Sequence, residues 1–326
     1  MFISSLSPLA KSGILLTLGL SIFGFADNLT LLVSDEVSVG QFHFSRSLSA
    51  IIIVIMFAYF SNTYLVIKNW TAIIFRTFFN VISMILYFSV IPMMPIAEAG
   101  AGLFTSPIFV LIFSFLFFKE NITLKQIFAF SLGILGVYLI VGRNLQPTIY
   151  HFFPILAGAT YAVGAIITNK YLQEEEPLSI LLCFLFSIGL IGLIISLFFT
   201  YYPVDVTISE KAPFIYRPWQ GQNLYFWIIM FFLGFLSSVA IYLIIKAYQL
   251  SKPTYAAIYE YTYLISAGFF SWLFWGIVPN FYGIIGIFSI VIAGTLIIIS
   301  NSTQNEKSFA VKPSFFMQVV LAITKV

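Results

Sequence analysis

The sequence has very little charge. Only 8% of its 326 residues are Asp, Glu, Lys or Arg, whereas 60% are hydrophobic and the mean hydropathy is +1.03. Soluble domains carry about a quarter charged residues. The composition therefore excludes a water-soluble domain and predicts an integral membrane protein whose surroundings are the lipid bilayer. The net charge of +3 then reflects loop lysines rather than a nucleic-acid partner.

Cysteine and nucleotide-binding motifs are also scarce. The single cysteine, Cys183, sits in an apolar run, so neither a disulfide framework nor a cysteine metal site is available. No GxxxxGK[ST] run, HExxH motif or Ser/His/Asp arrangement is present. We therefore expect no cofactor, no metal and no enzymatic activity, and the chain itself does not supply ATP-driven transport.

Long apolar runs are plentiful, and each is long enough to cross a hydrocarbon core of about 30 Å as a helix. Breaks fall at Pro, Asn and charged residues. We predict an all-α membrane protein of ten transmembrane helices at residues 12–33, 38–60, 71–91, 94–118, 124–142, 152–171, 178–201, 223–247, 253–276 and 281–300.

Basic residues predict the orientation, because cytoplasmic loops are enriched in Lys and Arg. With the N-terminus inside, ten lysines fall on the cytoplasmic side, and only Arg143, Lys211 and Arg217 fall outside. We therefore expect both termini in the cytoplasm and a multi-pass protein of the plasma membrane, the inner membrane of a bacterium.

Five helices form an odd number, so a duplicated five-helix unit would be inverted in the membrane. Residues 105–141 match residues 263–299, with Gly136-Val137 corresponding to Gly294-Thr295. We predict a first repeat at 1–145, a second at 146–302 and a cytoplasmic tail at 303–326.

Ionisable residues inside spans are costly in lipid and therefore point to function. Asp27, His43, Arg46 and Glu98 are placed at similar depths in the outer half by the helical rise of 1.5 Å per residue. We predict that they form an outer polar cluster. Arg76 and Glu260 lie near the inner face, where they could pair as a gate.

These charges have other interpretations. Arg46 and Arg76 could instead be structural, bonding to backbone carbonyls where helices are broken. The three acids, Asp27, Glu98 and Glu260, could carry a proton through a partly dry cavity.

Aromatic and breaking residues give the remaining candidates. Tyr255, Tyr259 and Tyr263 recur every four residues, which on a helix would place them on one face as the lining of a cavity. Simple packing is the alternative, because the chain has 18 Tyr and 38 Phe. Pro107 frees the carbonyl near Leu103 and is a candidate hinge.

Several motifs, in order, resemble those of the drug/metabolite transporter superfamily, specifically the EamA-type family. They are Phe23-Gly24-Phe25, Arg46 in "VGQFHFSRSLSA", and Pro107, Glu120 and Gly136 in the run beginning "SPIFVLIFSFLFFKEN". The segment "FGFADNLTLLV", which contains Asp27, resembles the corresponding segment in the carriers of S-adenosylmethionine and riboflavin, although Leu31 stands where those carriers often have lysine. The resemblance covers nearly the whole chain and implies alternating access between two five-helix halves.

We therefore predict a secondary transporter for a small cationic or zwitterionic metabolite, aromatic in part, driven by protons or by exchange. S-adenosylmethionine-like compounds, amino acids, nucleosides and vitamins are the candidate cargoes. The alternatives are a membrane-embedded enzyme acting on a lipid or prenyl substrate, with Asp27 and His43 as acid and base, and a structural or chaperone-like membrane protein. Assembly as a homodimer is left open.

Overall fold

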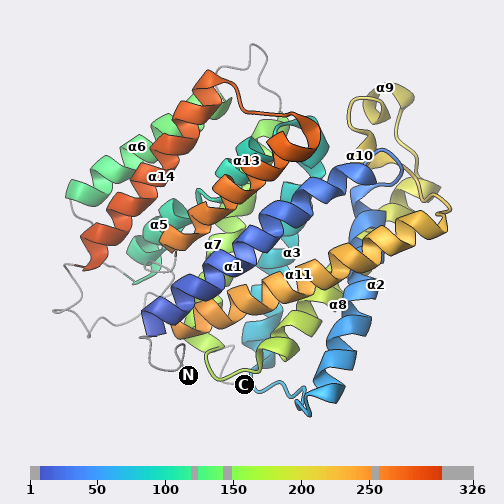
Figure 1. Cartoon of the computed structure of the whole chain (residues 1–326), viewed down its shortest axis with the longest axis horizontal. Helices are drawn as coiled ribbons and strands as arrows, with labels where there is room; N and C mark the ends of the chain where they lie inside the picture. Colours follow the sequence, from blue (N-terminus) through green and yellow to red (C-terminus); the bar gives the residue numbers. More distant parts are fainter. Residues whose placement is uncertain (1–7, 119–123, 142–148, 252–256, 303–326) are drawn as a thin grey trace.

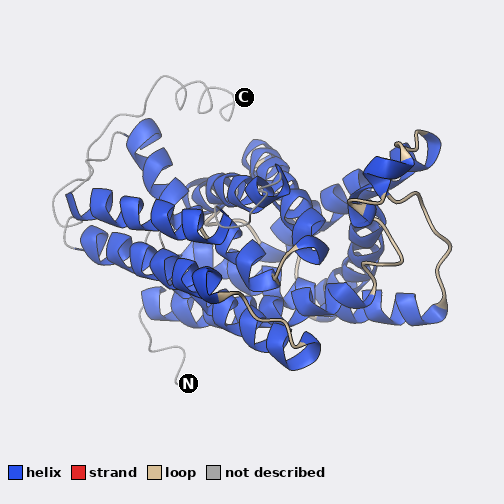
Figure 2. Ribbon diagram, turned by 90° about the horizontal axis from the view of Figure 1, so that it is seen from above, coloured by secondary structure: helices blue, strands red, loops and turns tan. Residues whose placement is uncertain are grey.

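The computed structural model describes residues 8–118, 124–141, 149–251 and 257–302. These residues form helices joined by loops, with no strand among them (Figure 2). The predicted all-helical membrane architecture is confirmed.

Seven of the described segments are long and apolar enough to cross a bilayer. They are α1 (Pro8–Leu29), α2 (Val39–Phe60), α3 (Trp70–Val90), α4 with α5 (Ile96–Leu103 and Ser106–Phe118), α7 (Phe153–Tyr171), α8 (Pro177–Tyr201) and α11 (Leu224–Leu250). Three are extended by short 3-10 turns, η1 (Thr30–Leu32), η2 (Ile91–Met93) and η3 (Ile149–Phe152).

The helices α6 (Leu124–Val141), α13 (Thr262–Trp275) and α14 (Phe281–Ser302) occupy the other predicted spans. The total of ten spans stays a prediction. The long connection before α11 holds α9 (Val206–Ser209) and α10 (Pro213–Tyr216).

Two predicted continuous helices are interrupted, which corrects the sequence-based expectation. The span at 94–118 breaks between Leu103 and Ser106. Pro107 has no N–H to donate to the Leu103 carbonyl four residues earlier, so the helix cannot run through this point unchanged. The span at 253–276 begins, in its described part, as the 3-10 helix η4 (Ala257–Tyr261) and becomes α-helical only at Thr262.

The helices pack in pairs that relate one half of the chain to the other. Counted in order, α1, α2, α3, α4–α5 and α6 correspond to α7, α8, α11, α13 and α14. The most extensive contacts join α6 to α14, α2 to α8, α3 to α7 and α1 to α11, and Figure 1 shows α6 alongside α14. Exchanging each helix for its counterpart leaves the first two pairs unchanged and converts α3–α7 into α11–α1. This is the packing expected of two repeats related by a pseudo-twofold axis.

The outer surface of the bundle is apolar. On α8, the exposed residues include Phe186, Leu190, Ile194 and Phe198 at intervals of four. Such a continuous stripe is unfavourable in water but suits contact with lipid tails. Most of the charged groups inside the long helices are buried instead, so the polar chemistry of the bundle lies between helices.

Two glycines bring α2 and α8 into backbone contact. A Cβ atom added at Gly192 would lie 2.6 Å from the Gly40 carbonyl oxygen, and one added at Gly40 would lie 2.6 Å from the Gly192 carbonyl oxygen. Close approach at small residues is a general way for membrane helices to associate. This crossing leaves no room for a side chain at either position.

We therefore expect Gly192→Leu to lose stable, monodisperse protein, because its side chain would force the α2 and α8 backbones apart. Size-exclusion chromatography and thermal melting in detergent would measure the loss. Gly221→Ala is the control, since no atom lies within 4 Å of a Cβ added there. Equal melting temperatures for wild type and Gly192→Leu would contradict the described crossing.

Candidate functional site

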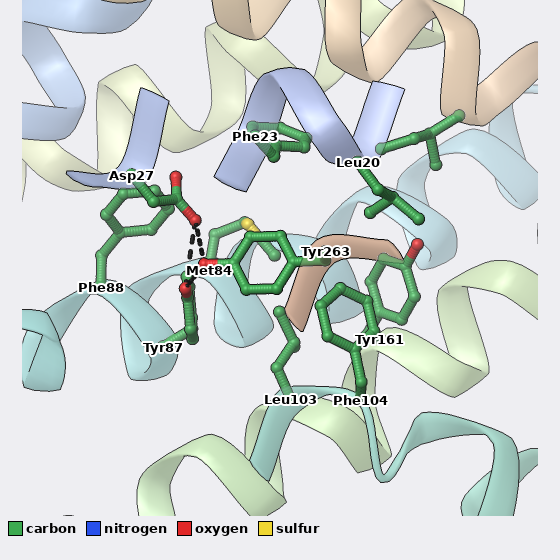
Figure 3. Close-up of a pocket in the computed structure, with 11 residues that line it drawn as sticks. Leu20, Phe23, Asp27, Met84, Tyr87, Phe88, Leu103, Phe104, Tyr161 and Tyr263 are labelled. Atoms are coloured by element: carbon green, nitrogen blue, oxygen red, sulfur yellow. Dashed lines mark hydrogen bonds between the residues drawn. The ribbon is translucent and has the colours of Figure 1, made fainter. Parts of the chain in front are cut away.

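A small cavity lies inside the bundle, where helices from both halves meet (Figure 3). Its volume is about 40 Å³, enough for a few water molecules but below the 300 Å³ or more that holds a typical small-molecule ligand. Its wall has six aromatic side chains, four aliphatic or methionine side chains and one carboxylate: Phe23, Tyr87, Phe88, Phe104, Tyr161, Tyr263, Leu20, Met84, Leu103, Ile244 and Asp27. The described residues therefore leave only a small, largely aromatic space between the halves.

Asp27 is the acidic group of this wall, and only 3% of it is exposed. Its Oδ2 accepts hydrogen bonds from the Tyr263 hydroxyl at 2.8 Å and the Tyr87 hydroxyl at 3.1 Å. The two hydroxyls also contact each other. The three residues come from α1, α13 and α3, so one carboxylate connects the two halves of the chain.

Arg46 and His43 lie next to this end of the cavity. An Arg46 Nη2–H donates to His43 Nδ1 at 3.2 Å. The guanidinium carbon lies 5.0 Å from the ring centre of Phe42 and 4.6 Å from that of Phe88, within the range of a cation–π contact. Phe88 also lines the cavity, and the charges of Arg46 and Asp27 act on each other. Asp27, His43 and Arg46 thus lie around Phe88 at one end of the cavity.

Glu98 does not join them. Its Oε1 lies 2.8 Å from where a Cβ on Gly283 of α14 would be, whereas a Cβ on Gly100 would meet the Tyr263 ring. Successive residues turn by about 100° around an α-helix, so Glu98 and Gly100 differ by about 200°. Glu98 therefore faces α14, on the side of α4 away from the cavity.

Arg76 and Glu260 also do not pair as predicted. Arg76 Nε donates to Thr168 Oγ1 at 3.4 Å, and the Ser106 hydroxyl donates to Glu260 Oε2 at 2.7 Å. The Ser106–Glu260 bond instead joins the two interrupted spans, at the start of α5 and within η4.

Of the three predicted tyrosines, the two that the structure describes, Tyr259 and Tyr263, do not share a face of one α-helix. Tyr263 lines the cavity, Tyr259 packs where α1 has Gly13, and Tyr255 lies outside the described residues. The reason is the 3-10 helix, which has three residues per turn and therefore does not keep an interval of four on one side.

Tyr87, Tyr161 and Phe88 line the cavity but were not singled out from the sequence. The signal available was a hydroxyl within an apolar run, which Tyr87 shares with many of the 18 tyrosines. Only the packing of α3 and α7 separates them from the rest.

Comparison with known proteins assigns the chain to a family. The model of the EamA-like transporter family matches residues 11–142 and again residues 148–300. The chain belongs to the EamA-like transporter family. It is thus a multi-pass membrane protein of the drug/metabolite transporter superfamily with two EamA repeats, and it is a transporter rather than an enzyme.

Curated relatives of this EamA-like transporter carry different cargoes. It is 24% identical over 283 residues to an S-adenosylmethionine uptake transporter of Rickettsia bellii, covering 85% of this chain and 88% of the relative. It is 24% identical over 289 residues to the pseudopaline exporter CntI of Pseudomonas aeruginosa, covering 87% and 95%. A riboflavin transporter of Brucella anthropi is 23% identical over 187 residues, or 57% and 61% of the two chains. These relatives thus include both uptake transporters and an exporter.

A solved crystal structure has the same fold. It superposes with a TM-score of 0.59 at 12% identity, covering 91% of this EamA-like transporter and 98% of the other chain. At that identity the likeness concerns the fold alone.

The bonds to Asp27 can be tested by removing their donors. We expect Tyr263→Phe to lower the free energy of unfolding of this EamA-like transporter by about 1–3 kcal/mol, because a buried carboxylate loses a donor. The double variant Tyr87→Phe with Tyr263→Phe should lose more. Denaturant or thermal melting in detergent would measure both, with the 86% exposed Tyr64→Phe as the control. Equal stability of the double variant and the control would show that these bonds do not hold Asp27.

Proposed function

We propose that this EamA-like transporter is a secondary carrier for a small cationic or zwitterionic metabolite with an aromatic part, working by alternating access. One observation carries the proposal: the carboxylate of Asp27 lies on the wall of an otherwise aromatic and apolar cavity between the two halves. Among the candidate cargoes, S-adenosylmethionine-like compounds and amino acids carry a positive charge, whereas common nucleosides and riboflavin are neutral. The proposal includes the bacterial inner membrane and cytoplasmic termini, on the strength of the lysine distribution.

The chemistry of the wall favours a cation. Asp27 accepts from two neutral hydroxyls, which a positively charged group of the cargo can replace with a stronger, charge-assisted bond. Six aromatic side chains line the same cavity as this carboxylate. Their ring faces attract cations and stack on planar heterocycles.

The size of the cavity requires movement. A volume of about 40 Å³ does not hold a metabolite, so the two halves must separate for cargo to enter. The shared bonds at Asp27 would break in that step. The interruptions at Leu103–Ser106 and at η4 are the points at which the spans can bend, and Leu103 and Phe104 at the first of them line the cavity.

Transport by reconstituted vesicles tests the proposal. We expect the purified protein to take up S-adenosylmethionine or an aromatic amino acid from a labelled panel that also contains nucleosides and riboflavin. Asp27→Asn keeps the shape of the side chain but removes its charge, so flux should fall at least about 10-fold, a loss of about 1.4 kcal/mol of interaction. Asp205→Asn, at an exposed cap outside the spans, is the control. Wild-type flux in Asp27→Asn, or uptake of only simple dicarboxylates, would reject the proposal.

Glu260 is the carboxylate that we propose for proton coupling. It is only 1% exposed, it bonds to Ser106 across the two interrupted spans, and it is separate from Asp27. A proton on this group would allow it to cross a dry region during the conformational change.

We expect Glu260→Gln to lose the stimulation of uptake by an inward proton gradient while keeping exchange of labelled for unlabelled cargo. Glutamine can still accept from Ser106 but cannot carry the proton. Paired gradient-driven and counterflow assays in vesicles would separate the two activities, with Glu210→Gln in the loop after α9 as the control. Unchanged gradient stimulation would remove Glu260 from coupling.

A further inference from the structure

Arg46 is a buried cation whose bonding is incomplete. It is 5% exposed, and its hydrogen bond to His43 Nδ1 is made by Nη2 alone. Its Nε has no partner among the described residues. Since a guanidinium only donates, the unfilled position calls for an acceptor.

An ion pair within the described part of the chain does not supply that acceptor. Asp27 is the acid at this end of the cavity, but its described hydrogen bonds are to Tyr87 and Tyr263, and none joins it to Arg46. A buried charge without an ionic partner is unfavourable, and in a membrane span it points to a ligand or to transport. A purely structural arginine would be expected to bond to backbone carbonyls, whereas the partners described for Arg46 are an imidazole and two aromatic rings.

The position of Arg46 connects it to the cavity. The Phe88 ring contacts the guanidinium and also forms part of the cavity wall. Figure 3 shows Phe88 beside Asp27 at one end of the cavity. If this ring moved aside as the cavity widened, the Arg46 guanidinium would face the same space as the Asp27 carboxylate.

We propose that Arg46 binds a carboxylate of the cargo while Asp27 binds its cationic group, so that the substrate is a zwitterion with an amino-acid-like head. This inference rests on the proposed function and narrows it. Asp27 and Arg46 carry opposite charges at the same end of a dry site, and these charges balance each other when the site is empty. The total charge stays balanced when a zwitterion binds. A simple cation would add an uncompensated charge, and a simple anion would meet Asp27.

Matched compounds with and without the carboxylate test this inference directly. The probes are S-adenosylmethionine and its decarboxylated form, tryptophan and tryptamine, and tyrosine and tyramine, compared as competitors of counterflow in vesicles of the full-length protein. In the pair that is recognised, we expect the carboxylate-bearing member to compete at least about 10-fold better in the wild type. Arg46→Gln should bring that ratio to about 1 without weakening the decarboxylated member, and Arg46→Lys should keep part of it. Arg217→Gln, outside the long helices, should keep the full ratio.

The outcomes separate this inference from the broader function. Equal competition by both members of a recognised pair in the wild type, or an unchanged ratio in Arg46→Gln, overturns the role of Arg46 but leaves a cation carrier standing. Failure of every probe to compete overturns the proposed cargo class and the zwitterion with it. The wild-type ratio needs no variant, so it decides the question even where Arg46→Gln does not fold.

Discussion

The carboxylate of Asp27, shared between tyrosine hydroxyls from two halves of the chain, is the constraint on which the site depends. A buried carboxylate requires donors, and Tyr87 and Tyr263 supply them from α3 and α13. This brings an α1 residue of the first half into contact with the second half at the cavity. Any movement that opens the cavity must exchange these bonds for others. In the mechanism that we propose, the cationic group of the cargo supplies that replacement, which would link binding to the change of conformation.

The rest of the fold serves this arrangement. Close glycine contacts, such as Gly40 with Gly192, hold helices together where lipid provides no hydrophobic driving force between them. Outward stripes of Phe, Leu and Ile suit lipid contact, and the charged groups of the candidate site are buried between helices. The interruptions near Pro107 and at η4 give the bundle backbone groups that are not committed to regular helices. Their connection through Ser106 and Glu260 joins the two places where the spans can bend.

Depth along a helix could be predicted from the sequence, but the direction in which a side chain faces could not. Counting residues from the helix ends placed Asp27, His43 and Arg46 at one level, and they lie together. The same count placed Glu98 with them, yet rotation about α4 turns it toward α14. The tyrosine interval of four assumed an α-helix where the backbone is 3-10. Tyr87 and Tyr161 became identifiable only through packing, because tyrosine is common throughout the chain.

Access of water to the cavity from both sides of the membrane tests alternating access most directly. Phe104→Cys, introduced with Cys183→Ser, would place a single thiol in the cavity wall, where a membrane-impermeant thiol reagent meets it only when the site is open to water. We predict labelling in sealed vesicles when the reagent is supplied on either side, and protection by transported cargo. A thiol at the outward-facing Phe186 should not react. Labelling from one side alone, or from neither, would contradict the account.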